Sequence, residues 1–88
     1  MAELTIDISS CTTALQCLDT VGKALGTPLG NFSILNRYLQ QHYYPNIILV
    51  GMKEFGERCP HATKELETIL KRVKDHFHKQ GKEFEYQI

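Results

Sequence analysis

Residues 45–58 read PNIILVGMKEFGER, and the number of strands in the fold depends on this segment. The uninterrupted apolar run at 47–50 would suit a short strand buried on both faces. Ile48, Met52 and Phe55, however, also fall on one stripe of a helix, with the charged side chains away from it. The proline that opens the segment suits a first helical turn. We therefore expect a helix over 45–58 and keep a strand at 47–50 as the alternative.

Alternation of apolar and polar residues predicts a strand at each end of the chain. Residues 3–8 and 84–88 both follow a period of two, which is typical of a strand with one buried face. The apolar members of the two patterns are Leu4, Ile6, Ile8, Phe84, Tyr86 and Ile88. We expect both segments to pair within a sheet.

Between the first strand and Pro45, helical spacing predicts two helices. Ser9 and Ser10 can cap the first, which ends at the turn over residues 26–30. Its apolar stripe comprises Ala14, Leu15, Leu18, Val21 and Leu25. Asn31 is a suitable cap for the second helix, which Pro45 ends.

A last helix, from Pro60 to a left-handed turn at Gly81, has the clearest pattern in the chain. Its apolar stripe comprises Ala62, Leu66, Ile69, Leu70, Val73 and Phe77. Residues 1–88 are therefore predicted to form one small α+β domain that is mostly helical. The expected order is strand, four helices, strand, and the alternative adds a third strand at 47–50.

Composition narrows the class of protein. The 88 residues carry ten basic and ten acidic side chains, so no net charge favours nucleic acid or an anionic membrane. The longest apolar run has four residues, against the roughly 20 that a membrane-spanning helix needs. Three cysteines, an odd number, do not fit a secreted disulfide scaffold. We expect a cytoplasmic protein with reduced thiols and no membrane segment.

The group Cys59-Pro60-His61 is the candidate redox or ligand site. A thiol at the amino end of a helix can have a lowered pKa and become reactive. The Cys-Pro pair resembles the dipeptide of haem-regulatory sites, so Cys59 and His61 could serve a redox, haem or metal sensor. The alternative is that Cys59 simply packs as a small apolar residue.

No resident metal or cofactor is predicted. His76 and His78 could join Cys59 and His61 as zinc ligands by type alone. They lie at the other end of the same helix, however, roughly 20–25 Å away at 1.5 Å per residue. A single site within one chain is therefore excluded by distance.

The segment His42-Tyr43-Tyr44 is the candidate partner contact, because polar aromatic side chains at a helix end can anchor another protein. The alternative is that half-buried tyrosines close a small core.

The function we expect is that of a non-enzymatic regulatory or protein–protein interaction module. Two strands alone do not make a stable sheet. We therefore expect a homodimer whose terminal strands join across chains, together with a further protein partner. The alternative function is the sensor built on Cys59 and His61. A small enzyme with Cys59 as nucleophile and a histidine as base stays open as a third reading.

Overall fold

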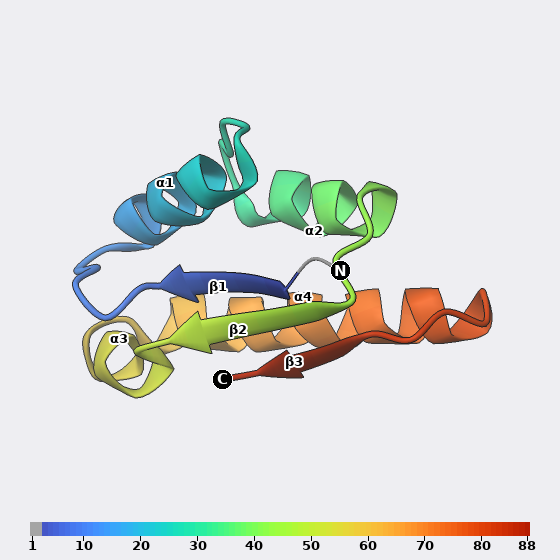
Figure 1. The fold of residues 1–88 in the computed structure, drawn as a ribbon. Coiled ribbons are helices and arrows are strands. Elements are labelled where there is room, and N and C mark those ends of the chain that lie inside the picture. The colour runs from blue at the N-terminus through green and yellow to red at the C-terminus, as the bar shows by residue number, and fades with distance from the viewer. Residues whose placement is uncertain (1–2) are drawn as a thin grey trace.

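The computed structural model describes residues 3–88 as a three-stranded parallel sheet with two helical crossover connections (Figure 1). Its elements are β1 (Glu3–Asp7), α1 (Ala14–Leu25), α2 (Phe32–Gln41), β2 (Asn46–Val50), α3 (Met52–Arg58), α4 (Pro60–Lys79) and β3 (Glu85–Gln87). The fold is thus a small α+β domain with four helices. The strands predicted at the two ends of the chain are confirmed.

The segment 45–58 divides into a strand and a short helix, so the alternative with a third strand is correct. A helix over the whole segment was wrong, because residues 46–50 form β2 and only 52–58 form α3. Gly51 separates the two elements with a left-handed backbone at φ 89°. A Cβ atom at this position would lie only 2.4 Å from the Cβ of Ser9, so the ends of β1 and β2 meet closely there.

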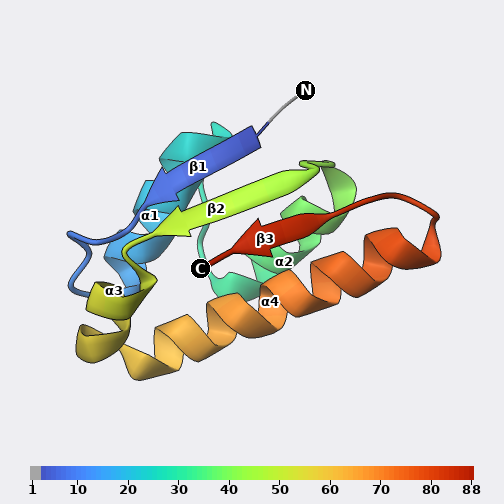
Figure 2. The ribbon, with the colours of Figure 1, turned by 60° about the horizontal axis from the view of Figure 1, so that its bottom comes forward.

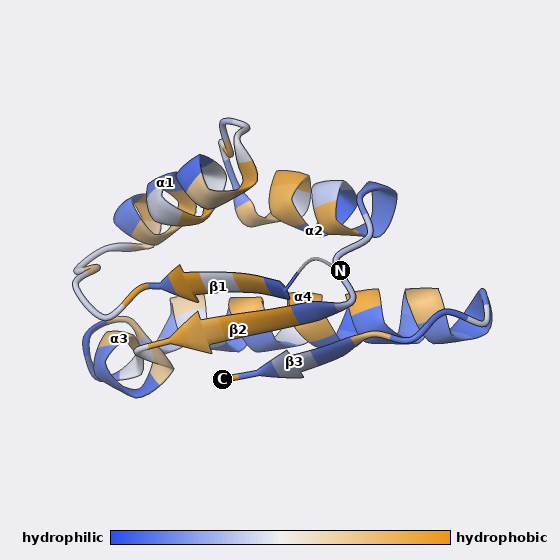
Figure 3. Ribbon diagram, in the orientation of Figure 1, coloured by the Kyte–Doolittle hydropathy of each residue, from blue (hydrophilic) through white to orange (hydrophobic). Residues whose placement is uncertain are grey.

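The sheet has the order β1-β2-β3, and its register sets which residues share a face. Ile6 pairs with Leu49, and Leu4 pairs with Ile47. These residues and Tyr86 face the helices, and Ile47 is only 2% exposed. Figure 2 shows α1 and α2 behind the strands, α4 alongside β3, and α3 beyond the ends of β1 and β2. Figure 3 shows that β2 is apolar over most of its length.

Both helices of the first crossover have side-chain caps. Thr13, and not Ser9 or Ser10 as expected, caps α1 by accepting a hydrogen bond from the Gln16 amide at 3.1 Å. Ser9 is engaged elsewhere, because its amide and hydroxyl both donate to the Asp7 carboxylate. Asn31 caps α2, as predicted.

The carboxyl-terminal helix matches its prediction closely. Helix α4 begins at Pro60, and Gly81 follows it with φ 74°. All six residues of its predicted stripe are buried. Strand β3 is shorter than expected: Phe84 lies buried before it, and Ile88, after it, is 51% exposed. None of the helices in residues 3–88 has the length and apolar character needed to cross a membrane.

Candidate functional site

An open groove of about 510 Å³ lies between the outer side of α1 and the turn that follows it. We call it the α1 groove. Its lining comprises Leu15, Asp19, Gly22, Lys23, Gly26, Thr27, Pro28 and Leu29. The helical residues in this set are spaced by three, four or one, so they occupy one side of α1.

Gly22 is the residue that brings the turn against the helix. A Cβ atom at this position would lie 2.7 Å from the carbonyl oxygen of Thr27, so any larger residue would push the turn away. The Thr27 amide donates to the Gly22 carbonyl oxygen at 2.9 Å, and Gly26 supplies the left-handed residue that ends the helix at φ 75°. Backbone hydrogen bonds therefore hold the turn that lines the groove against the end of α1.

Leu15 is the most exposed large hydrophobic side chain of the described residues, with 73% of its surface accessible. The sequence stripe counted it with the core, whereas the structure buries Leu18, Val21 and Leu25 and leaves Leu15 outside. Leu15 follows Ala14 directly, and consecutive residues point about 100° apart on a helix. The groove thus has an exposed apolar side chain at its edge.

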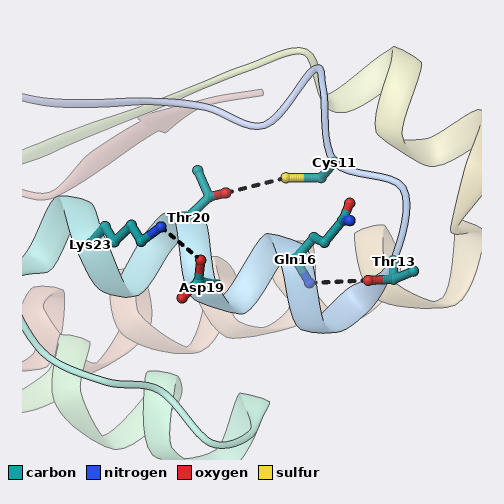
Figure 4. A network of polar contacts seen from close by, with 6 residues as sticks. All are labelled: Cys11, Thr13, Gln16, Asp19, Thr20 and Lys23. Carbon is teal, nitrogen blue, oxygen red and sulfur yellow. Dashed lines mark hydrogen bonds and ion pairs between the residues drawn. The ribbon is translucent and has the colours of Figure 1, made fainter.

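The polar wall of the groove is an ion pair. Lys23 Nζ lies 3.1 Å from Asp19 Oδ2, and both side chains are mostly exposed (Figure 4). Exposed pairs one helical turn apart contribute only about 0.3–0.5 kcal/mol. The two charges are therefore free to exchange their partner for groups of a bound molecule.

The candidate redox or ligand pair lies where α3 meets α4, beside the segment that precedes α1. Cys59 joins α3 to α4 and is half-buried, and its thiol donates to the carbonyl oxygen of Thr12 at 3.3 Å. His61, in the first turn of α4, is exposed. No group of three or more potential ligands among residues 3–88 is placed to hold a metal ion.

The thiols of Cys11 and Cys17 lie near Cys59 in the structure, and their spacing in the sequence did not predict this. Cys11 and Cys17 are both buried, and the Cys11 thiol lies 3.5 Å from the Thr20 hydroxyl. Burial, with smaller contributions from the neighbouring thiols of Cys11 and Cys59, raises the pKa of Cys17 to about 12. At neutral pH the Cys17 thiol is consequently protonated and unreactive.

The aromatic segment His42-Tyr43-Tyr44 packs the end of α2 against neighbouring elements. His42 stacks on Tyr38 with 4.0 Å between ring centroids. The Tyr43 hydroxyl donates to the carbonyl oxygen of Glu83, and its ring meets that of Phe77 edge-on. Burial, followed by a hydrogen bond with Tyr38, raises the pKa of Tyr44. Tyr43 nevertheless remains 40% exposed, so it keeps a surface that a partner could contact.

The proposed dimer strands use their apolar sides within the chain. Ile6, Ile8 and Phe84 are buried in the core, and Leu4 and Tyr86 pack against it. Because β2 supplies a third strand, the shortage that called for pairing between chains is removed. Only the outer edges of β1 and β3 lack a strand partner within residues 3–88.

The chain matches no known protein family model, no curated protein and no solved structure significantly.

Proposed function

We propose that the protein is a non-enzymatic protein–protein interaction module that binds its partner at the α1 groove. The observation that carries this proposal is the exposure of Leu15 at the edge of a preformed groove. The side chains that line the groove supply apolar surface and one ion pair. These groups suit recognition of another molecule.

Burial of Leu15 supplies the driving force. Moving a leucine side chain from water into an apolar environment contributes about 1.5–3 kcal/mol. Few interface residues supply most of the binding free energy, and they sit in pockets that exclude water. A partner that covers Leu15 would therefore gain a large part of its affinity from this one contact.

Rigidity of the groove lowers the cost of binding. Ordering a flexible loop at an interface consumes affinity, whereas a loop that is already fixed does not. The turn is held by the amide of Thr27 on Gly22 and is stiffened by Pro28. The groove therefore keeps its shape in the free protein.

The groove also indicates what the partner presents. Its volume lies within the roughly 300–1,000 Å³ of typical ligand pockets, which accommodates one large side chain with its flanking backbone. We infer that the partner inserts an apolar side chain beside Leu15. A carboxylate or a cation next to that side chain would pair with Lys23 or Asp19.

A homodimer is a second candidate, because the outer edge of β1 has no strand partner among the described residues. An exposed edge is a template for pairing with another strand. Two copies joined at β1 would form a six-stranded sheet. Light scattering at micromolar concentration tests this: a dimer supports it, and a 10.1 kDa monomer contradicts it.

Three free thiols support the proposed cytoplasmic location of such a protein.

Photo-crosslinking tests the main proposal. A photoreactive amino acid replacing Thr27, in the groove, should crosslink the partner in cells of the native host. The Leu15→Arg variant should abolish this product, because a charge would enter the apolar contact. Ile88→Arg, at an exposed apolar position outside the groove, is the matched control and should leave the product intact. Equal crosslinking in the wild type and the Leu15→Arg variant would contradict the proposal.

A further inference from the structure

The sheet has a second side that no helix of the described chain covers. Figure 2 looks onto this open face, with the strands in front of α1 and α2. By register it comprises Glu3, Thr5 and Asp7 of β1, Asn46, Ile48 and Val50 of β2, and Glu85 and Gln87 of β3.

An uncovered face is unusual for a parallel sheet. Parallel sheets occur almost only where both faces are covered, and their strands then read as unbroken apolar runs. Strand β2 has such a run at residues 47–50. Within this run, Ile47 and Leu49 pack against the helices, whereas Val50 is 44% exposed on the open face and Ile48 is half-buried there. The central strand thus has the composition of a strand covered on both sides.

Acidic side chains surround these apolar residues. Glu3 and Asp7 lie at the two ends of β1, and Glu85 lies on β3. Lys74 of α4 reaches Glu85 at 3.1 Å and compensates that charge. Among residues 3–88, neither Glu3 nor Asp7 forms an ion pair. Ser9 hydrogen bonds lower the pKa of Asp7, so this carboxylate is ionised at neutral pH.

The charge pattern argues against a second copy of this chain as the cover. Face-to-face packing of two copies through a twofold axis would bring the carboxylates of Glu3 and Asp7 into a shared, partly desolvated interface. Like charges across an interface disfavour association. A partner with lysine or arginine side chains beside its apolar residues would instead be complementary.

The dimensions of the face match one helix. Three strands spaced about 4.8 Å apart span about 10 Å, which is close to the 10–12 Å diameter of a helix with its side chains. Five residues of strand extend about 16 Å, the length of a helix of about eleven residues. Helices are also the elements that normally cover parallel sheets.

We propose that the open face of the sheet binds a basic amphipathic helix of another protein. Its apolar stripe packs on Ile48 and Val50, and its flanking lysine or arginine side chains pair with Glu3 and Asp7. This site is separate from the α1 groove and extends the proposed function by a second docking surface.

Nuclear magnetic resonance titration of the full chain tests the proposal. The probe is a 14-residue peptide of leucine and lysine at helical spacing, and a leucine–glutamate peptide of the same pattern is its control. We expect the basic peptide to shift amide signals of β1, β2 and β3 and to become helical. The acidic peptide should cause no such shifts. No binding by the basic peptide, or equal binding by both, would overturn the proposal.

Variants identify the contacts. Val50→Lys should weaken binding of the basic peptide about tenfold, because a like charge would replace the apolar contact. Glu3→Gln and Asp7→Asn should each weaken it about 1.4- to 5-fold at low salt, the range of exposed ion pairs. Thermal unfolding establishes that the three variants are folded.

Leu15→Arg is the matched control and should leave binding of this peptide unchanged. If Leu15→Arg weakens binding while Val50→Lys does not, the peptide occupies the α1 groove and the open face is not its site. Crosslinking of a partner at the α1 groove is independent of this result, so the two proposals can fail separately.

Discussion

The two faces of the sheet are built from the same three strands and differ in what lies on them. On one face Leu4, Ile6, Ile47 and Leu49 pack against α1, α2 and α4 and are largely removed from water. On the other, neighbouring residues of the same strands meet solvent. Because successive side chains alternate in direction, one position along a strand separates a residue that stabilises the fold from one available for binding.

The largest effect should come from truncating adjacent residues on the two faces. Leu49→Ala, on the covered face, should lower the free energy of unfolding by about 2–5 kcal/mol because it leaves a cavity in the core. Val50→Ala, on the open face, should lower it by less than about 1 kcal/mol. Denaturant unfolding measures both. Similar losses for the two variants would mean that something covers the open face in solution.

Gly51 should be the next most sensitive position, because it holds the ends of β1 and β2 together. Gly51→Ala places a Cβ against Ser9 and forces a left-handed backbone, so we expect a loss of about 1–3 kcal/mol in unfolding free energy. Gly56→Ala is the control, since its Cβ would meet Thr63 at an ordinary 3.4 Å within a helix. It should be neutral or stabilise by up to about 1 kcal/mol. Calorimetry compares them, and equal effects would disprove the close contact at Gly51.

Burial should also separate the reactivities of the cysteines. With no exposed surface and a pKa of about 12, Cys17 should be labelled by iodoacetamide at pH 7 only when the chain opens. Half-buried Cys59 should react faster than Cys17 and Cys11. Mass spectrometry of labelled peptides gives the three rates. Equal rates at Cys59 and Cys17 would argue against the redox-sensor alternative for Cys59.

The smallest effect concerns the acidic rim of the open face. The Asp7 pKa lies below its ordinary 3.8 because the Ser9 hydroxyl and amide donate to the carboxylate. Ser9→Ala removes the hydroxyl bond, so the pKa of Asp7 should rise part of the way toward 3.8. A lowered pKa stabilises the fold above the unfolded value, and this contribution is lost as the pH falls through the folded pKa. Titration of the Asp7 carboxyl by nuclear magnetic resonance measures the change, and an unchanged pKa would assign the shift to the amide alone.

Local periodicity predicted those parts of the fold that local contacts determine. Helix α4, the cap of α2 at Asn31 and the two terminal strands follow from spacing of three to four, or of two. Local periodicity did not decide the structure of segment 45–58. Ile48, Met52 and Phe55 fit a helical stripe as well as residues 47–50 fit a buried strand. Pairing of β2 with β1 and β3, distant in sequence, determines its structure, and spacing does not report such contacts.

The candidate site was less accessible to sequence reasoning. Helical spacing predicts a core position for Leu15, three residues before Leu18, and only the packing of α1 shows that it points outward. Gly22 offered a signal that was not used. A glycine inside an otherwise regular apolar stripe suggests a close approach of backbone, which the turn at Thr27 makes.

The parallel register has a consequence for the order in which the chain folds. Asn46 pairs with both Glu3 and Glu85, so each strand pair joins residues about 40 positions apart. Helices form within about a microsecond from local contacts, whereas each strand pair must first close a long loop. We expect α4 to gain structure early and the sheet to assemble in the rate-limiting step. Until that step is complete, the apolar run of β2 is exposed on both sides, and the chain is then most prone to aggregate.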